Sequence, residues 1–341
     1  MWAAAYSTSL LALVSVLFPF WAQAPIGQYP RQQLTAVALS AVIPDDESPR
    51  IVKVLFAGDM LFDRSIRKTV DEKGGDFIFS CIDDVLKSAD FVVANLEGPI
   101  TEHESVSAPS SPGDSNNYTF TFPPETARLL AAHNITLVNI GNNHILNFGT
   151  EGARSTIDAL NAAGVAYFGL PAIATAQAGD PISHSTYRHQ SFFPVVMTFI
   201  GYNEFDPIGT QASAAGTVEW VNNAHENREI PIVYTHWGDE YAAASPERIK
   251  KLARQFIDAG AKIVIGSHPH VVAEHEIYRG RHIYYSLGNF IFDQYFSDEV
   301  RNGLMLLVTF NQFGVQDIEE IPIWLETDRR TCPHTNFAVA S

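Results

Sequence analysis

The sequence predicts an α/β fold in which two packed mixed β-sheets are flanked by helices. Short apolar runs typical of strands alternate with segments that carry helix-capping signals, an order typical of βαβ units and a largely parallel sheet. Further strand-like runs follow one another toward the C-terminus. We expect these later strands to form a second, more antiparallel sheet packed on the first.

Eight runs are predicted as strands because they are rich in Val, Ile, Leu and Phe and end at small or polar residues. They span 51–58, 91–98, 135–142, 192–202, 230–238, 262–270, 282–292 and 303–311. Capping signals predict helices over 123–133, 150–164 and 245–260. A polar Ser/Pro/Gly segment, 104–117, is predicted as a mobile surface loop near the strand ends.

The composition excludes some classes of function. The chain has 341 residues, of which 46% are hydrophobic and 18% charged, enough for one large core or one core plus a small appendage. Its net charge of −16, without any long basic run, argues against a protein that holds DNA or RNA electrostatically. An anionic substrate would need a local attraction instead, and a bound divalent cation supplies one.

The N-terminus carries a targeting signal. The apolar run Leu10–Ala24 ends in a small-x-small pattern that resembles a signal-peptidase site, although Pro25 disfavours cleavage there. An uncleaved membrane anchor over Ala3–Ala24 is the competing interpretation, and a buried helix is the third. Either of the first two places the rest of the chain outside the cytoplasm, secreted or anchored to the cell membrane.

Four segments are predicted along the chain. Residues 1–24 form the signal peptide or anchor, 25–50 a linker rich in Gln, Pro and Ser, 51–295 the main domain, and 296–341 the C-terminal strands and a tail. The two cysteines, Cys81 and Cys332, either pair or remain as buried free thiols, and the sequence does not distinguish these alternatives.

Five predicted strand ends share one pattern: an apolar run, a small residue, then a side chain able to bind metal. Ligands gather outside the carboxyl ends of parallel strands, so we expect these side chains to converge on one crevice. The candidate ligands are Asp59, Glu97, Asn143, His236, His268 and His270.

These side chains suit a hydrolytic metal centre. Carboxylates, an amide oxygen and neutral imidazoles without thiolate favour one or two divalent ions of Mn, Fe or Zn. Each residue taken alone has an ordinary explanation: Asp59 as a cap, Asn143 as a turn former, His236 as a core histidine. In His268-Pro269-His270, alternation would place both imidazoles on one side of an extended segment.

The sequence resembles the CapA family, named for capsule and poly-γ-glutamate biosynthesis, a branch of the calcineurin-like metallophosphatase superfamily. The resemblance runs from about Ile51 to Gln294 and rests on six ordered motifs. They are GDMLFDR, NLEGPIT, GNNHILNFG, THWGDEY, GSHPHVV and YSLGNFIFDQ. The resemblance implies a four-layer αββα sandwich of the metallophosphatase kind.

The resemblance also implies a role for each candidate. Asp59 and His270 would bind a first metal, and Glu97 would bridge two metals. His144 would lie beside the substrate as charge stabiliser or proton donor to the leaving oxygen. Asn143, His236 and His268 would bind the second metal.

Three positions depart from the superfamily or family pattern. Leu61 stands where typical metallophosphatases have a metal-binding histidine, a loss the family shares. Glu97 stands where the wider superfamily has Asp, and Asn147 where the family usually has an acid. With only Asp59, Glu97 and His270 as ligands, the first metal site is expected to bind weakly or to stay empty, and one or two ions are predicted in total.

Arg64, at the end of GDMLFDR, is predicted to act at the catalytic site by pairing with an anionic substrate group. The alternative is a salt bridge with a neighbour such as Asp63.

The leading hypothesis is an exported or membrane-anchored metal-dependent hydrolase, phosphoesterase-like, that acts on an anionic polymer such as poly-γ-glutamate or on a phosphoester. One alternative is a non-catalytic accessory subunit of a membrane polymer synthase, and another is a metal-dependent amide hydrolase. Leu61 and Asn147 favour the accessory interpretation.

Overall fold

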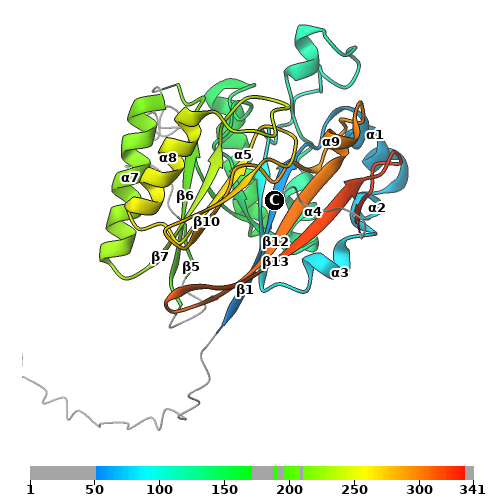
Figure 1. Cartoon of the computed structure of the whole chain (residues 1–341). Coiled ribbons are helices and arrows are strands. Elements are labelled where there is room, and N and C mark those ends of the chain that lie inside the picture. Colours follow the sequence, from blue (N-terminus) through cyan, green and yellow to red (C-terminus); the bar gives the residue numbers. More distant parts are fainter. Residues whose placement is uncertain (1–50, 171–186, 190–194, 208–209, 335–341) are drawn as a thin grey trace, which may run out of the picture. The chain divides into compact units, whose positions relative to one another are not determined.

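A computed structural model describes residues 51–170, 187–189, 195–207 and 210–334 (Figure 1). The predicted signal peptide or anchor and the predicted linker lie outside the described residues. No helix in the described ranges is long and apolar enough to cross a membrane.

The first sheet has a parallel centre and an antiparallel edge. Its order is β14-β13-β12-β1-β2-β3-β4, and β11 pairs in parallel with the end of β1. Strands β1 to β4 run parallel, whereas β12, β13 and β14 are antiparallel to their neighbours. The strands are β1 (Val52–Met60), β2 (Phe91–Leu96), β3 (Ile135–Asn139), β4 (Ala166–Phe168), β11 (Asn289–Ile291), β12 (Asn302–Asn311), β13 (Gly314–Leu325) and β14 (Thr331–Pro333).

The second sheet has the order β5-β6-β7-β8-β10-β9. Strands β6, β7, β8 and β10 are parallel, and the edge strands β5 and β9 are antiparallel to their neighbours. The strands are β5 (Tyr187–His189), β6 (Met197–Asn203), β7 (Ile230–His236), β8 (Ile263–Ser267), β9 (His275–Tyr278) and β10 (Arg281–Tyr284).

Helices cover the outer faces of both sheets. The first sheet packs against α1 (Arg64–Lys73), α2 (Asp76–Phe79), α3 (Asp83–Leu86), α4 (Thr126–Ala132) and α5 (Gly149–Ala163). The second sheet packs against α7 (Thr210–Glu226) and α8 (Glu247–Asp258), which lie side by side (Figure 1). The short helices η1 (Ser115–Tyr118) and α9 (Asp298–Arg301) lie in connections.

The central strands are buried on both faces, so alternate residues pack into different layers. In β1, Val54 and Phe56 join the core between the sheets, whereas Leu55 and Ala57 join the core under the first group of helices. The Tyr234 hydroxyl on β7 donates to the Ala57 carbonyl oxygen at 2.6 Å, which ties the sheets together. The order helices, sheet, sheet, helices confirms the predicted architecture.

The assignment of the later strands was wrong. They do not build a separate antiparallel sheet: β12 to β14 extend the first sheet, and the second sheet is parallel at its centre. The predicted strand 282–292 is in fact two strands, β10 in the second sheet and β11 in the first. Gly288, with φ 68°, lies at the crossing between them and adopts a conformation that favours glycine.

The two cysteines form a disulfide. Cys81 precedes α3, and Cys332 lies in β14, 251 residues further along the chain. The bond decides between the two alternatives that the sequence left open, and it fastens the edge strand of the first sheet to the helices that cover it.

Candidate metal centre

All six candidate ligands lie at the carboxyl ends of strands or just beyond them. Asp59 is the residue before the last in β1, and Glu97 follows β2 directly. These two side chains lie close to the three histidines at or just beyond the ends of strands of the second sheet. The six candidate ligands, called the cluster below, therefore lie where the two sheets meet. Asn143 follows β3, His236 ends β7, and His268 and His270 follow β8.

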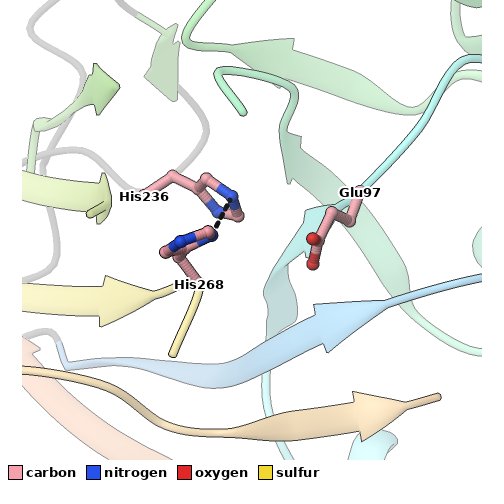
Figure 2. A group of neighbouring side chains, drawn as sticks. All are labelled: Glu97, His236 and His268. Atoms are coloured by element: carbon pink, nitrogen blue, oxygen red, sulfur yellow. Dashed lines mark hydrogen bonds between the residues drawn. The ribbon is translucent and has the colours of Figure 1, made fainter. Parts of the chain in front are cut away.

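The cluster contains two groups that share one carboxylate. Glu97, His236 and His268 form one group, and Asp59, Glu97 and His270 form the other. Within each group the possible ligand atoms all lie within 4.8 Å of one another. Figure 2 shows Glu97 facing the two imidazoles of the first of these groups. The sharing of Glu97 matches the bridging position that the resemblance implies.

Short contacts join the ligands from different strands. His236 Nε2 lies 2.8 Å from Asn143 Oδ1 and 3.2 Å from His268 Nδ1. His270 Nε2 lies 3.6 Å from Glu97 Oε1. Two ligands on adjacent corners of one ion, each bonded at about 2.1 Å, are themselves separated by roughly 3 Å. The observed separations therefore suit a shared cation.

Glu97 gives the clearest sign that the site takes a cation. Its side chain is fully buried, yet neither carboxylate oxygen accepts a hydrogen bond from the residues that the structure describes. Burial, together with the negative charge of Asp59, raises the pKa of Glu97 well above its usual value. A buried carboxylate without a hydrogen bond is expensive, and a cation bound by the two groups would compensate its charge.

The imidazoles are suited to bind metal at neutral pH. Burial lowers the pKa of His268 from 6.5 to about 4 and lowers the pKa of His236 well below 6.5. Both rings are therefore neutral at pH 7, with lone pairs available. Neutral imidazoles and buried carboxylates are the donor set of Mn, Fe and Zn sites, so the residues present fit a divalent ion.

Buried amides hold Asp59 and its surroundings in place. Asn95 Nδ2 donates to Asp59 Oδ1 at 2.8 Å, and the backbone N–H of His268 donates to Asp59 Oδ2 at 3.0 Å. Asn139 and Asn142 in turn donate to Asn95 Oδ1. The ligand carboxylate of the first sheet is thus linked to the ligand loop of the second.

The His268-Pro269-His270 segment differs from its predicted form. It is not extended: His268 has φ 98° and His270 has φ 58°, left-handed values that are uncommon for residues other than glycine. Both rings reach the cluster through this turn rather than by strand alternation. Arg64 (φ 51°) and Tyr241 (φ 61°), which lie nearby, share the unusual conformation. Such strain concentrates at functional sites.

His144 lies beside the cluster, where the resemblance placed a catalytic imidazole. Its Nε2 is 3.8 Å from Glu97 Oε1, and its ring packs on Phe120 at 4.3 Å between centroids. Asn147 Oδ1 accepts from the Phe120 N–H, so His144 Nδ1 is the donor in its 2.9 Å contact with that oxygen. Burial lowers the pKa of His144 to about 4.

Arg64 forms a salt bridge, but with Asp293 and not with Asp63. Asp63 instead caps α1, accepts from Arg67 at 3.1 Å and accepts from the loop residue Ser107 at 2.7 Å. The guanidinium of Arg64 lies over the ring of Phe120, 5.0 Å from its centroid. Because Phe120 also packs on His144, Arg64 is one side chain removed from the cluster.

A cavity of about 330 Å³ lies at Arg64, and its lining residues include none of the six candidate ligands. One wall comes from the loop 104–117, which Asn117 fastens to Arg64 and to Ser110. Tyr241 also lines the cavity and connects it to the cluster, because its ring centroid is 6.1 Å from that of His270. The loop therefore lies beside the cavity, near the candidate metal centre, as its position between predicted strands suggested.

Three residues contact the candidate ligands in ways that the sequence alone did not predict. Asn95 bonds to Asp59, Asn289 contacts His270, and the Phe205 ring packs on His268 at 4.4 Å between centroids. Asn95 and Asn289 both lie inside the quoted motifs, which was the available signal. Phe205 lies outside them and carried no signal.

The fold and the cluster together define a class of protein. It is a two-sheet α/β protein whose strand ends carry carboxylates and imidazoles in an arrangement suited to bind metal. Within that class, the chain belongs to the bacterial capsule synthesis protein family PGA_cap, whose sequence profile matches residues 53–294. This membership confirms the resemblance to the CapA family.

Several known proteins are similar to the chain. The PGA biosynthesis protein CapA of Bacillus subtilis (strain 168) is 28% identical over 288 residues, which cover 81% of this chain and 72% of that protein. The capsule biosynthesis protein CapA of Bacillus anthracis is 28% identical over 252 residues, covering 70% and 59%. The chain therefore spans less than two thirds of the second relative. A solved structure, TT1561 of Thermus thermophilus, covers 77% of this chain and 99% of that chain at 10% identity, with a TM-score of 0.40.

Proposed function

We propose that the chain is a metal-dependent, phosphoesterase-like hydrolase that handles an anionic cell-surface polymer such as poly-γ-glutamate. The observation that carries the proposal is Glu97, a buried carboxylate that has no hydrogen-bond partner among the described residues and belongs to both groups of possible metal ligands. Family membership, and relatives named for PGA and capsule biosynthesis, support the polymer.

The proposed ligands are the five residues of the two groups, which share Glu97, together with Asn143, whose Oδ1 lies 2.8 Å from His236 Nε2. A divalent ion of Mn, Fe or Zn there supplies Lewis-acid polarisation of a phosphoryl or carbonyl oxygen and a water nucleophile at neutral pH. The protein's own residues bind and orient the substrate. His144 is positioned to stabilise charge or to exchange a proton with the leaving oxygen.

The cavity beside the cluster is the proposed substrate site. Among the described residues that line it, Arg64 is the only basic one, and an anionic substrate group there would compete with Asp293 for the guanidinium. Tyr118 and Phe296, at 53% and 67% exposure, offer rings on which a polymer segment can pack. An open, aromatic rim suits a chain-like ligand better than a small one.

We propose an extracytoplasmic location. The Cys81–Cys332 disulfide supports it, because such bonds persist in oxidising compartments and are rare in the cytosol. The predicted N-terminal targeting segment is consistent with secretion or with anchoring to the membrane, where a polymer synthase would be the partner.

A non-catalytic accessory role is the second candidate. Asn147 supplies an uncharged acceptor to His144, which does not outweigh the effect of burial, and the pKa of His144 falls to about 4. An imidazole that stays neutral at pH 7 is a weak proton donor. A relative in Mycobacterium tuberculosis, 25% identical over 229 residues, is named a probable polyglutamine synthesis accessory protein.

A substrate screen separates these functions. Phosphodiester and amide substrates are incubated with the full chain and Mn²⁺, beside His144→Ala and the control His103→Ala, an exposed histidine outside the cluster. We expect turnover that falls about 10²–10⁴-fold in His144→Ala and persists in the control. Turnover of amides alone would identify the third hypothesis, an amide hydrolase. Retention of metal without any turnover would favour the accessory role.

A further inference from the structure

We propose that Asn289 is a positioning residue that fixes the ring proton of His270 on Nδ1 and so presents Nε2 to the metal. The inference rests on the proposed function, since it concerns the group formed by Asp59, Glu97 and His270. Asn289 is fully buried, and its place in β11 is set by pairing with Asp59 in β1.

The orientation of the Asn289 amide is determined by its neighbours. Its Nδ2 lies 3.0 Å from the Val300 carbonyl oxygen, 3.3 Å from the His270 carbonyl oxygen and 3.2 Å from Gln294 Oε1. Backbone carbonyls can only accept, so the NH₂ must face them. The opposite orientation would bring Oδ1 against two acceptors. Oδ1 therefore faces His270.

This orientation decides which nitrogen of His270 carries the proton. Asn289 Oδ1 lies 2.9 Å from His270 Nδ1 and can only accept. A second polar neighbour of Nδ1 is Asp59 Oδ2 at 3.4 Å, also an acceptor. Nδ1 is therefore protonated, and the lone pair of neutral His270 is on Nε2, the atom 3.6 Å from Glu97 Oε1.

The fixed tautomer matters most in this group, because His270 is its only imidazole. Leu61, where typical members of the superfamily have a histidine, is fully buried and offers no ligand atom. With a single nitrogen donor, a ring that presented its N–H to the ion would leave two carboxylates only. A partner that holds the ligand's other nitrogen typically changes metal affinity 10–100-fold.

The tautomer is measured in the metal-free protein by long-range ¹H–¹⁵N spectra, with His270 assigned by its loss in His270→Ala. We expect the Nδ1–H form in the parent and in Asn289→Asp, whose carboxylate still accepts. Asn289→Ala should populate both forms. A parent ring protonated on Nε2 overturns the inference, whatever the variants do, and this outcome does not depend on metal binding or turnover.

Calorimetric titration with Mn²⁺ supplies the second readout. The binding event abolished by His270→Ala should weaken about 10–100-fold in Asn289→Ala, and the remaining event should persist. Asn134→Ala is the control: Asn134 Nδ2 also donates to two carbonyls, Leu86 O and Ala89 O, but at the opposite end of β3 from the cluster. Equal weakening in both variants, or none in Asn289→Ala, contradicts the inference. If the parent binds no Mn²⁺, the proposed function is contradicted. The spectra still show whether Asn289 holds the His270 proton on Nδ1.

Discussion

Glu97 is held where its ionised form is penalised, and this has a consequence for the metal-free protein. Its pKa is raised by burial, so between pH 4.5 and the raised pKa the native state holds a proton that the unfolded state has lost. Stability from this group is present below pH 4.5 and is lost as pH rises. A tenfold change in the acid constant between the two states corresponds to about 1.4 kcal/mol.

Glu97→Gln removes that titration. We expect the chelator-treated variant to be more stable than the parent at pH 7, with the difference shrinking toward pH 4.5, and to bind metal weakly. Urea unfolding at several pH values measures the difference in the free energy of unfolding between the variant and the parent. A difference that does not change with pH would show that Glu97 is not ionised against a penalty.

His144 and its acceptor offer a second test at the scale of the residue. Asn147→Asp replaces a neutral acceptor with an anionic one, which stabilises the imidazolium and should raise the pKa of His144 from about 4 toward 6.5. An NMR titration of the ring follows the shift. In a hydrolase, the acidic limb of the pH–rate profile should move in the same direction. An unchanged pKa of His144 in Asn147→Asp would mean that the residue at position 147 does not set the pKa of this imidazole.

Sequence reasoning was most successful for residues that act through their own chemistry. Asp59, Glu97 and the histidines were predicted because their side chains and strand-end positions are visible in the sequence, and the structure brings them together. Asn289 acts through a ring 19 positions away, and Arg64 pairs with a residue 229 positions away. Such contacts depend on the fold and cannot be found from local spacing.

At the scale of the element, Gly58 in β1 allows the close approach of the chain at Gly288, next to the ligand Asp59. An added Cβ at Gly58 would lie 1.8 Å from the Gly288 carbonyl oxygen, so only glycine allows the approach that makes the 3.0 Å bond from Asp59 N to Gly288 O. The glycine before the ligand is thus required by the neighbouring chain rather than by its own turn.

Gly58→Ala should therefore destabilise the protein by about 3 kcal/mol, the upper end of overpacking, and also release metal by displacing Asp59. Gly164→Ala is the matched control. Gly164 ends α5 with φ 72° and open space around it, so alanine there adds only backbone strain of about 1–2 kcal/mol. Thermal unfolding and metal content measure both. Metal loss in the control as well would point to general destabilisation.

The predicted strands were confirmed where a strand lies at the centre of a sheet with parallel strands beside it. The runs that became β1, β2, β3, β7 and β8 were apolar on both faces, which is typical of parallel strands at a sheet centre. The run 282–292 failed because it is buried from Ile283 to Phe292 although the chain crosses between the sheets at Gly288. Continuous burial conceals such a crossing from periodicity.

At the scale of the molecule, the Cys81–Cys332 disulfide closes nearly the whole described chain into a loop. Replacing both cysteines by serine should lower the free energy of unfolding by about 2–5 kcal/mol, because the unfolded chain regains freedom. The cluster lies elsewhere, so metal content should be kept. Urea unfolding of the variant and of the reduced parent measures the effect, and equal midpoints for oxidised and reduced protein would contradict it.

Layer architecture was predictable because alternating strands and helices leave few ways to bury every apolar face. Sheet membership of the last strands was not, since β12 pairs with β1 across most of the length of the chain and only the completed fold shows which edge was free.

The number of metal ions bound per chain decides whether the six proposed ligands form a metal site. Metal in the full chain, purified without chelator, is counted by mass spectrometry beside Asp59→Ala and His268→Ala. We expect one or two divalent ions per parent chain and a clear loss in both variants, each of which removes a ligand from a different group. A parent without metal even after Mn²⁺ or Zn²⁺ loading, or variants that keep the parent's full complement, would contradict it.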